Sequence, residues 1–327
     1  MQDNKFLSVK NLTVEYVTSE ETVHAVNDVS FDLEKGKTLG LVGETGAGKT
    51  SIARAILRVL PVPPAVVRSG SICLNGTELM EISEAEMCKI RGNNITMIFQ
   101  DPMTALNPTM RVGKQISEVI KIHSGCSKQE AKAQAEKMLE MVGIPKERYN
   151  EYPHQFSGGM KQRVVIAIAL ACNPDLLLAD EPTTALDVTI QAQVLDMMRN
   201  LNKTKNTSMI LITHDLGVVA EMCDEVAVVY AGSICEKGTL EDVFDHPTHP
   251  YTKGLFDAVP NLKDDTDRLK PIHGLPPDPS NLPSGCSFHP RCPYATEACK
   301  QGQIPNLEVS PGHFCRCIMA KGGAVND

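Results

Sequence analysis

The chain has 327 residues, a length that suggests two domains or one large domain with an appendage. Hydrophobic residues make up 42% and charged residues 22%, which is the composition of a globular protein and argues against a disordered chain. The net charge of -8 argues against a general nucleic-acid surface, which would carry a basic stripe.

No stretch reaches the roughly 20 apolar residues that a bilayer-spanning helix needs, and the best run covers residues 164–172. Residues 1–5 lack the apolar core of a signal peptide. We therefore expect a cytosolic chain that reaches a membrane only through partners. In that reducing compartment, 11 cysteines favour metal binding or plain burial over disulfides.

Up to about residue 250, short β-branched runs alternate with helical patterns, which predicts an α/β fold with a largely parallel sheet. The expected strands are near-continuous apolar runs at residues 38–43, 95–99, 176–180, 208–213 and 225–230. Residues 102–172 form a helical stretch, whose clearest helix begins at the capping box of Ser127 and Glu130 and ends near Gly143. We interpret this stretch as an inserted helical subdomain.

After about residue 250, eight prolines fall between residues 260 and 293 and five cysteines follow Gly285. This composition opposes regular helices and predicts an irregular appendage. We therefore take residues 1–250 as one domain and residues 251–327 as a C-terminal extension.

The run Gly-Glu-Thr-Gly-Ala-Gly-Lys-Thr at residues 43–50 fits the phosphate-binding pattern G-x-x-x-x-G-K-[ST], between a predicted strand and a helix-compatible run. Backbone N–H groups and the helix N-terminus would hold phosphate oxygens, Lys49 would neutralise them, and Thr50 would bind Mg²⁺. The alternative, a simple glycine turn, does not explain this context. The expected nucleotide-binding residues are Gly43, Glu44, Thr45, Gly46, Ala47, Gly48, Lys49, Thr50 and Ser51.

Two acids, Asp180 and Glu181, end a buried apolar strand, at the edge where open α/β sheets bind ligands. Asp180 would hold the Mg²⁺ shell, and Glu181 would polarise a water for in-line attack on a phosphate. Without the upstream loop, the pair would equally be a solvated strand end.

The run Phe-Ser-Gly-Gly-Met-Lys-Gln at residues 156–162 precedes a helix and the acid pair. Here the chain resembles the ABC ATPases, a P-loop NTPase family with a RecA-like core, whose signature commonly reads Leu-Ser-Gly-Gly-Gln. Phe156 and Met160 depart from it, whereas the core is kept in Ser157, Gly158 and Gly159. A hydroxyl, flexible amides and a helix N-terminus form a second anion-binding device. The resemblance implies that it contacts the γ-phosphate of ATP held by the opposite subunit; alone, it would be only a turn.

The same resemblance implies further roles. Gln100 would touch the Mg²⁺ and the attacking water, and Asp187 would cross the dimer interface. His214 would contact the γ-phosphate, and Tyr16 would stack on adenine. On their own, His214 and Tyr16 would be interpreted as structural residues.

Six cysteines are scattered through the first 250 residues, and we expect them to be small buried hydrophobes: Cys73, Cys88, Cys126, Cys172, Cys223 and Cys235. The other five lie in the proline-rich segment, which can build little core, so a metal centre would supply cross-links. Four thiolates can hold Zn²⁺ or an iron–sulfur cluster, and the spacing lacks the paired knuckles typical of structural zinc.

Residues 245–254 and 285–293 resemble the oligopeptide and dipeptide importer ATPases, and nickel importers share much of that tail. The resemblance implies a [4Fe–4S] cluster, with Zn²⁺ or unliganded thiols as alternatives. In the family pattern, the last cysteine follows a histidine by a few residues. His313 stands at about that distance before Cys317, which favours Cys317 over Cys315 as the fourth ligand. The implied ligands are Cys286, Cys292, Cys299 and Cys317, with Cys315 as the alternative.

The expected function is ATP hydrolysis that energises uptake of di- or oligopeptides, at the cytoplasmic face of the membrane. The implied partners are two integral-membrane permease subunits, a second ABC ATPase, identical or different, and indirectly an extracytoplasmic substrate-binding protein. One alternative is a nickel importer ATPase. Another, a soluble ABC ATPase acting on nucleic acid, is disfavoured by the acidic charge and the absence of heptads. A catalytically dead regulator is disfavoured because Lys49, Glu181 and His214 are all present.

Overall fold

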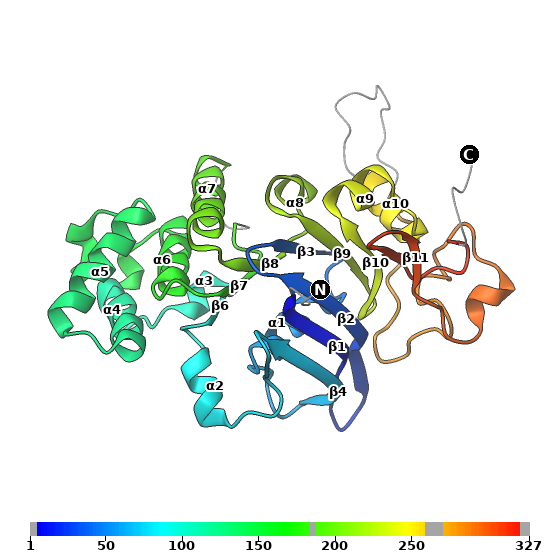
Figure 1. Ribbon diagram of the computed structural model, residues 1–327, viewed down its shortest axis with the longest axis horizontal. Coiled ribbons are helices and arrows are strands. Elements are labelled where there is room, and N and C mark those ends of the chain that lie inside the picture. The colour runs from blue at the N-terminus through cyan, green and yellow to red at the C-terminus, as the bar shows by residue number, and fades with distance from the viewer. Residues whose placement is uncertain (1–4, 184–187, 259–270, 321–327) are drawn as a thin grey trace. The chain divides into compact units, whose positions relative to one another are not determined.

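The computed structural model describes residues 5–183, 188–258 and 271–320 (Figure 1). Contacts divide the chain into two compact units, each discontinuous in sequence. Unit 1 consists of Met1–Leu7, Leu33–Thr38 and Leu74–Thr213. Unit 2 consists of Ser8–Asp32, Leu39–Cys73 and His214–Asp327.

Unit 1 contains three parallel strands in the order β8-β7-β6. They are β6 (Ile95–Ile98), β7 (Leu176–Asp180) and β8 (Ser208–Ile212). Every residue of these strands is buried, which explains their unbroken apolar sequences. The expected strands are confirmed here, although the first and last of them end one residue earlier than the apolar runs suggest.

The stretch expected to be helical, residues 102–172, also belongs to unit 1, and its helices α4, α5 and α6 lie together in Figure 1. The helices of this stretch are α3 (Pro102–Ala105), α4 (Val112–Ser124), α5 (Lys128–Met141), the short 3₁₀ helices η1 (Lys146–Asn150) and η2 (Pro153–Gln155), and α6 (Gly158–Leu170). The capping box is confirmed, because the Ser127 hydroxyl accepts the Glu130 N–H and the Glu130 carboxylate accepts the Ser127 N–H. The other elements of unit 1 are β5 (Thr77–Glu78), α2 (Glu84–Ile90) and α7 (Val188–Lys205).

Unit 2 carries the strand order β11-β12-β10-β9-β3. These strands are β3 (Thr38–Val42), β9 (Glu225–Tyr230), β10 (Ser233–Thr239), β11 (Leu307–Ser310) and β12 (His313–Cys315). β3 and β9 are parallel, whereas the β9–β10, β10–β12 and β11–β12 pairs are antiparallel. In unit 2, the parallel β3–β9 pair is therefore followed by the antiparallel β10, to which the C-terminal extension adds β12 and β11.

A second sheet has the order β2-β1-β4, formed by β1 (Lys5–Val17), β2 (Thr22–Glu34) and β4 (Ala65–Leu74). The helices of unit 2 are α1 (Lys49–Ile56), α8 (Leu216–Met222), α9 (Leu240–Asp245) and α10 (Pro250–Asp257). None of the helices within the described ranges is both long enough and apolar enough to cross a membrane.

A buried carboxylate ties the extension to β10. Glu236 accepts the N–H groups of Thr248 at 2.7 Å and His249 at 2.9 Å, and the His313 ring nitrogen lies 2.8 Å from it. Glu236, His249 and His313 are 1%, 2% and 3% exposed. A buried charge must be hydrogen-bonded to be tolerated, so this network fixes β12 and the start of α10 against β10.

The cysteine-bearing part of the extension is irregular, as expected. Between residues 271 and 296 it forms turns and bends without a helix or strand, and only the 3₁₀ helix η3 (Glu297–Lys300) follows before β11. The short strands β11 and β12 were not expected from the sequence.

Candidate functional site

Residues 43–50 form the loop between β3 and α1, the expected position for a phosphate-binding loop. Gly48 has φ of +98°, and a Cβ there would lie 2.2 Å from the Ala25 carbonyl oxygen, so only glycine fits. The first turn of α1 holds no acidic residue, which leaves its positive N-terminal end free to attract anions. The loop tip at Thr45 and Gly46 is exposed.

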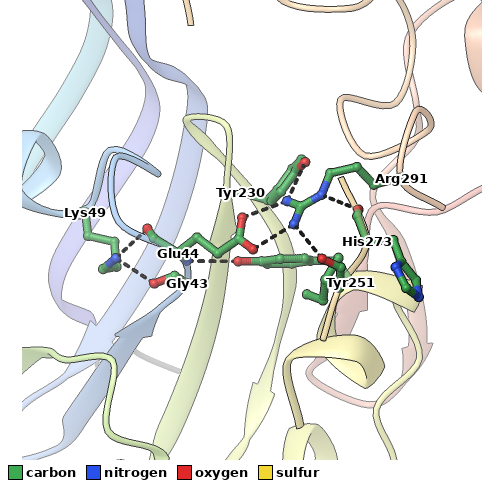
Figure 2. Close-up of polar contacts among 8 residues, drawn as sticks. Gly43, Glu44, Lys49, Tyr230, Tyr251, His273 and Arg291 are labelled. Atoms are coloured by element: carbon green, nitrogen blue, oxygen red, sulfur yellow. Dashed lines mark hydrogen bonds and ion pairs between the residues drawn. The ribbon is translucent and has the colours of Figure 1, made fainter. Parts of the chain in front are cut away.

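Lys49 is buried at the start of α1, 8% exposed. Its ammonium donates to the carbonyl oxygens of Gly43 at 2.7 Å and of Glu44 at 2.9 Å. The positive charge is thereby held inside the loop (Figure 2). This is the position from which a lysine neutralises phosphate oxygens in such loops.

Tyr16 in β1 lies at the start of the same helix. Its hydroxyl is 3.0 Å from the Ser51 hydroxyl. The ring is therefore anchored one residue beyond Thr50, at the edge of the loop.

Two residues of the C-terminal extension hold Glu44 by hydrogen bonds and an ion pair (Figure 2). Its N–H donates to the Tyr251 hydroxyl at 2.9 Å. Its two carboxylate oxygens accept from the two terminal nitrogens of Arg291, at 2.7 and 3.0 Å. This hydrogen bonding to Glu44 is the main cause that raises the pKa of Arg291. The pairing is bidentate, the strongest common form of ion pair.

In unit 1, the acid pair stands at the end of β7. Asp180 is buried, 2% exposed, and Glu181 has φ of +47°, a conformation that bulky side chains rarely adopt. The Glu181 N–H donates to the Ile212 carbonyl at 2.8 Å, and Gln100 Nε2 donates to the Glu181 carboxylate at 3.1 Å. The structure thus brings the two expected water-positioning residues into direct contact.

The Ser-Gly-Gly motif begins α6, where the exposed Ser157 caps the helix by accepting the Met160 N–H. The two departures from the common signature share one neighbour, because Arg148 stacks over the buried Phe156 ring at 4.3 Å and donates to the Met160 sulfur at 3.2 Å. Both departures are thus accommodated inside the unit, and the Ser157 end of the helix stays open.

The expected nucleotide-site residues are divided between the units. The loop residues, Tyr16 and the exposed His214 belong to unit 2. Unit 1 holds Gln100, Asp180, Glu181 and the Ser157 motif. Asp187 lies outside the described residues.

Three residues of the site were missed by the sequence analysis: Gln162, Tyr251 and Arg291. Gln162, 1% exposed, donates to the Pro182 carbonyl at 2.7 Å and so ties α6 to the residue after the acid pair. It stands within the signature run, which was the available signal. No local spacing rule connects Tyr251 or Arg291 to Glu44.

Four of the five C-terminal cysteines line one small cavity of about 10 Å³: Cys286, Cys292, Cys299 and Cys317. Burial raises the thiol pKa of Cys286, Cys292 and Cys317, and the neighbouring thiols add to each shift. Cys315 instead lies fully buried in β12, opposite Glu236. Among the described residues, no group of three or more His, Cys, Asp or Glu side chains is arranged to hold a metal ion.

Of the six scattered cysteines, Cys223 and Cys235 are buried as expected. The expectation is wrong for Cys88, which is exposed on α2. Its sulfur lies 3.9 Å from the Glu84 carboxylate, one helical turn earlier.

Two family descriptions match this chain. "ABC transporter" matches residues 26–184, and "Oligopeptide/dipeptide transporter, C-terminal region" matches residues 235–299. The first range contains the phosphate loop, the Ser-Gly-Gly motif and the acid pair. The second contains Arg291 and three of the four cavity cysteines.

Several relatives are similar over almost their whole length. The chain is 52% identical to the oligopeptide transport ATP-binding protein OppD of Haemophilus influenzae, covering 95% of this chain and 99% of that one. It is 50% identical to OppD of Bacillus subtilis, covering 95% and 88%. It is 50% identical to the dipeptide transport ATP-binding protein DppD of Lactococcus lactis, covering 97% and 91%.

Solved structures match the cassette portion. A dimeric post-hydrolysis state of the ATP-binding cassette MJ0796, bound to ADP and phosphate, gives a TM-score of 0.66 at 27% identity, covering 72% of this chain and 98% of that one. The cbiO1 protein of Clostridium perfringens, part of an ABC transporter complex, gives 0.62 at 25% identity, covering 75% and 92%.

Proposed function

Because this chain belongs to the oligopeptide and dipeptide branch of the ABC transporter ATP-binding proteins, we propose that its ATP hydrolysis drives the uptake of di- and oligopeptides. The observation that carries this proposal is that one chain joins the ABC cassette to the tail of peptide transporters. The names of the relatives favour peptides over nickel.

The chain is an ATPase coupled to transport. For its chemistry, we propose that Lys49 and the N-terminus of α1 hold the β- and γ-phosphates. Glu181 would then polarise the attacking water, oriented by its hydrogen bond with Gln100. His214 would contact the γ-phosphate, and Tyr16 would stack on adenine, consistent with its anchoring at Ser51.

Magnesium suits the oxygen donors of the expected ligands, since hydroxyl and carboxylate oxygens are the ligands that this hard cation prefers. We propose Thr50, Asp180 and Gln100 as the residues that hold it. When bound, Mg²⁺ neutralises charge that develops on the phosphate oxygens. The position of Asp180 supports this role, because it ends the buried strand β7, at the edge where open α/β sheets bind ligands.

We propose that two such cassettes enclose the nucleotides, each lending its Ser157, Gly158 and Gly159 to the other. Exposure of Ser157 at the start of a 13-residue helix supports this, as does the dimeric state of a similar cassette. Asp187 would lie at this interface. The second ATPase would be an identical or related subunit, and two integral-membrane permease subunits would hold the pair at the cytoplasmic face of the membrane. A substrate-binding protein outside would deliver peptide.

Replacing Glu181 by Gln is expected to keep ATP binding and lower turnover by roughly a hundredfold or more, because the phosphate cradle stays while the charge that activates water is lost. Equilibrium binding of a fluorescent ATP analogue and steady-state phosphate release measure the two effects. Glu136→Gln, on α5, where the carboxylate pairs with Lys132, serves as the matched control. Turnover of the Glu181 variant equal to that of the control would refute the assignment.

The substrate class is tested on the whole transporter, purified through a tag on this chain and reconstituted in vesicles. Peptide-loaded binding protein is expected to stimulate ATP hydrolysis and to accumulate peptide inside, whereas Ni²⁺ is not. Stimulation of ATP hydrolysis by Ni²⁺ alone would identify nickel, and not peptides, as the transported substrate. Stimulation by DNA, lost on raising the salt concentration, would instead place it among ATPases that act on nucleic acid.

For the extension, we propose residues 251–327 as a separate module after the nucleotide-binding domain of residues 1–250, holding a [4Fe–4S] cluster on Cys286, Cys292, Cys299 and Cys317. Four thiols around one cavity are the donor set of such clusters, and an irregular segment gains cross-links from one. At about 10 Å³ the cavity admits roughly a single water, which is less space than a cluster would occupy. Cys315 is disfavoured as a ligand because it lies in the β12 ladder.

Anaerobically purified protein is expected to be brown, with about four irons per chain. Cys317→Ala should lose this iron, whereas Cys315→Ala and the exposed control Cys88→Ala should keep it. Iron and acid-labile sulfide analysis decides the matter. Colourless protein with one zinc per chain, despite adequate iron supply, would refute the cluster and identify zinc as the bound metal.

A further inference from the structure

Glu44 places a carboxylate inside a loop that binds a polyanion. Its charge has the same sign as the phosphates, and like charges at close range oppose binding. Its side chain is 26% exposed. A partner that neutralises Glu44 and fixes its direction is therefore useful to ATP binding.

Arg291 is that partner, supplied from 247 residues further along the chain. Its side chain is only 5% exposed, and its guanidinium also donates to the carbonyl of His273 at 3.1 Å and to the Tyr230 hydroxyl at 3.2 Å. Figure 2 shows these groups fixing the guanidinium from several sides. A buried, multiply held arginine loses little further entropy when it pairs, unlike a surface ion pair.

Aromatic packing fixes the same region. The Tyr230 and Tyr251 rings lie 4.5 Å apart, and Phe288, three residues before Arg291, packs on them at 5.2 and 5.4 Å. Tyr251 is fully buried and accepts the Glu44 N–H through its hydroxyl. The extension therefore holds both the backbone and the side chain of Glu44.

We propose that Arg291 is a positioning residue of the ATP site, which neutralises Glu44 and turns its carboxylate away from the phosphates. The C-terminal extension thereby sets the affinity of the phosphate loop for ATP. The pairing lies within unit 2, and neither Glu44 nor Arg291 is among the cysteines proposed as cluster ligands.

The experiment is a double-mutant cycle read as equilibrium affinity for a fluorescent ATP analogue, on the full-length chain. Arg291→Met is expected to weaken binding by roughly tenfold, because an unneutralised carboxylate then faces the phosphates. The loss should shrink at high salt, which screens that repulsion. Arg291→Lys should lie between, since it keeps the charge without the bidentate fork.

The decisive variant is Glu44→Gln combined with Arg291→Met. Its affinity is expected to return to that of Glu44→Gln alone, because no carboxylate is left to repel ATP. A merely structural role for Arg291 would not permit this rescue: the double variant would then bind as weakly as Arg291→Met, and the proposal would be overturned. It would equally be overturned if Arg291→Met bound ATP as the wild type does.

Lys300→Met is the matched control, since it removes a cation of the same segment that pairs with Glu297 on the surface. Circular dichroism and thermal unfolding of each variant show whether it is folded at the binding temperature. Should Arg291→Met unfold, Arg291→Lys and its combination with Glu44→Gln complete the cycle with the same two outcomes. Failure of peptide transport in the reconstituted complex would leave this result unaffected.

Discussion

A loop that cradles a polyphosphate must keep its own shape without its ligand, and here that shape depends on how residue 44 is held. The carbonyl of Glu44 accepts from Lys49, its N–H donates to Tyr251, and its carboxylate pairs with Arg291. Every polar group of this residue is therefore fixed before ATP arrives. Groups that are already ordered lose little further conformational entropy when the ligand binds. Fixing Glu44 in advance therefore favours ligand binding by the loop.

A comparable constraint holds the proposed hydrolytic residue of unit 1. Glu181 has a positive φ, a conformation that costs about 1–3 kcal/mol for a side chain of this kind. Its N–H bond to Ile212 and the hydrogen bond from Gln100 hold it there. The hydrogen bond from Gln162 to the Pro182 carbonyl connects α6, which begins at the Ser157 motif, to the residue after the acid pair.

The sequence predicted the parts of the fold that local rules govern. Strands such as β7 are unbroken apolar runs because both faces are buried. The capping box at which α5 begins can be recognised from its residue types and their spacing. The short β11 and β12 could not be predicted in the same way. They have only four and three residues, and they form because β10, far earlier in the chain, pairs with β12, which in turn pairs with β11.

The candidate site divides along the same line. The phosphate loop, the acid pair and the Ser-Gly-Gly motif are contiguous and were found from spacing, whereas Arg291 meets Glu44 only through the tertiary fold. The structure also distinguishes the two candidates for the fourth cysteine ligand, between which the spacing did not decide. Cys317 lines the cavity, whereas Cys315 lies opposite Glu236. Such pairings join residues far apart in the sequence, so they can be identified only from the folded structure.

The C-terminal extension holds the phosphate loop through the Glu44 amide, and hydrogen exchange at that amide measures the hold most directly. In the wild type, that N–H donates to the buried Tyr251 hydroxyl and should exchange slowly. Tyr251→Phe removes the acceptor and keeps the ring, so exchange is expected to become faster at Glu44 and to stay unchanged in α1. Equal exchange at Glu44 in the two proteins would contradict it.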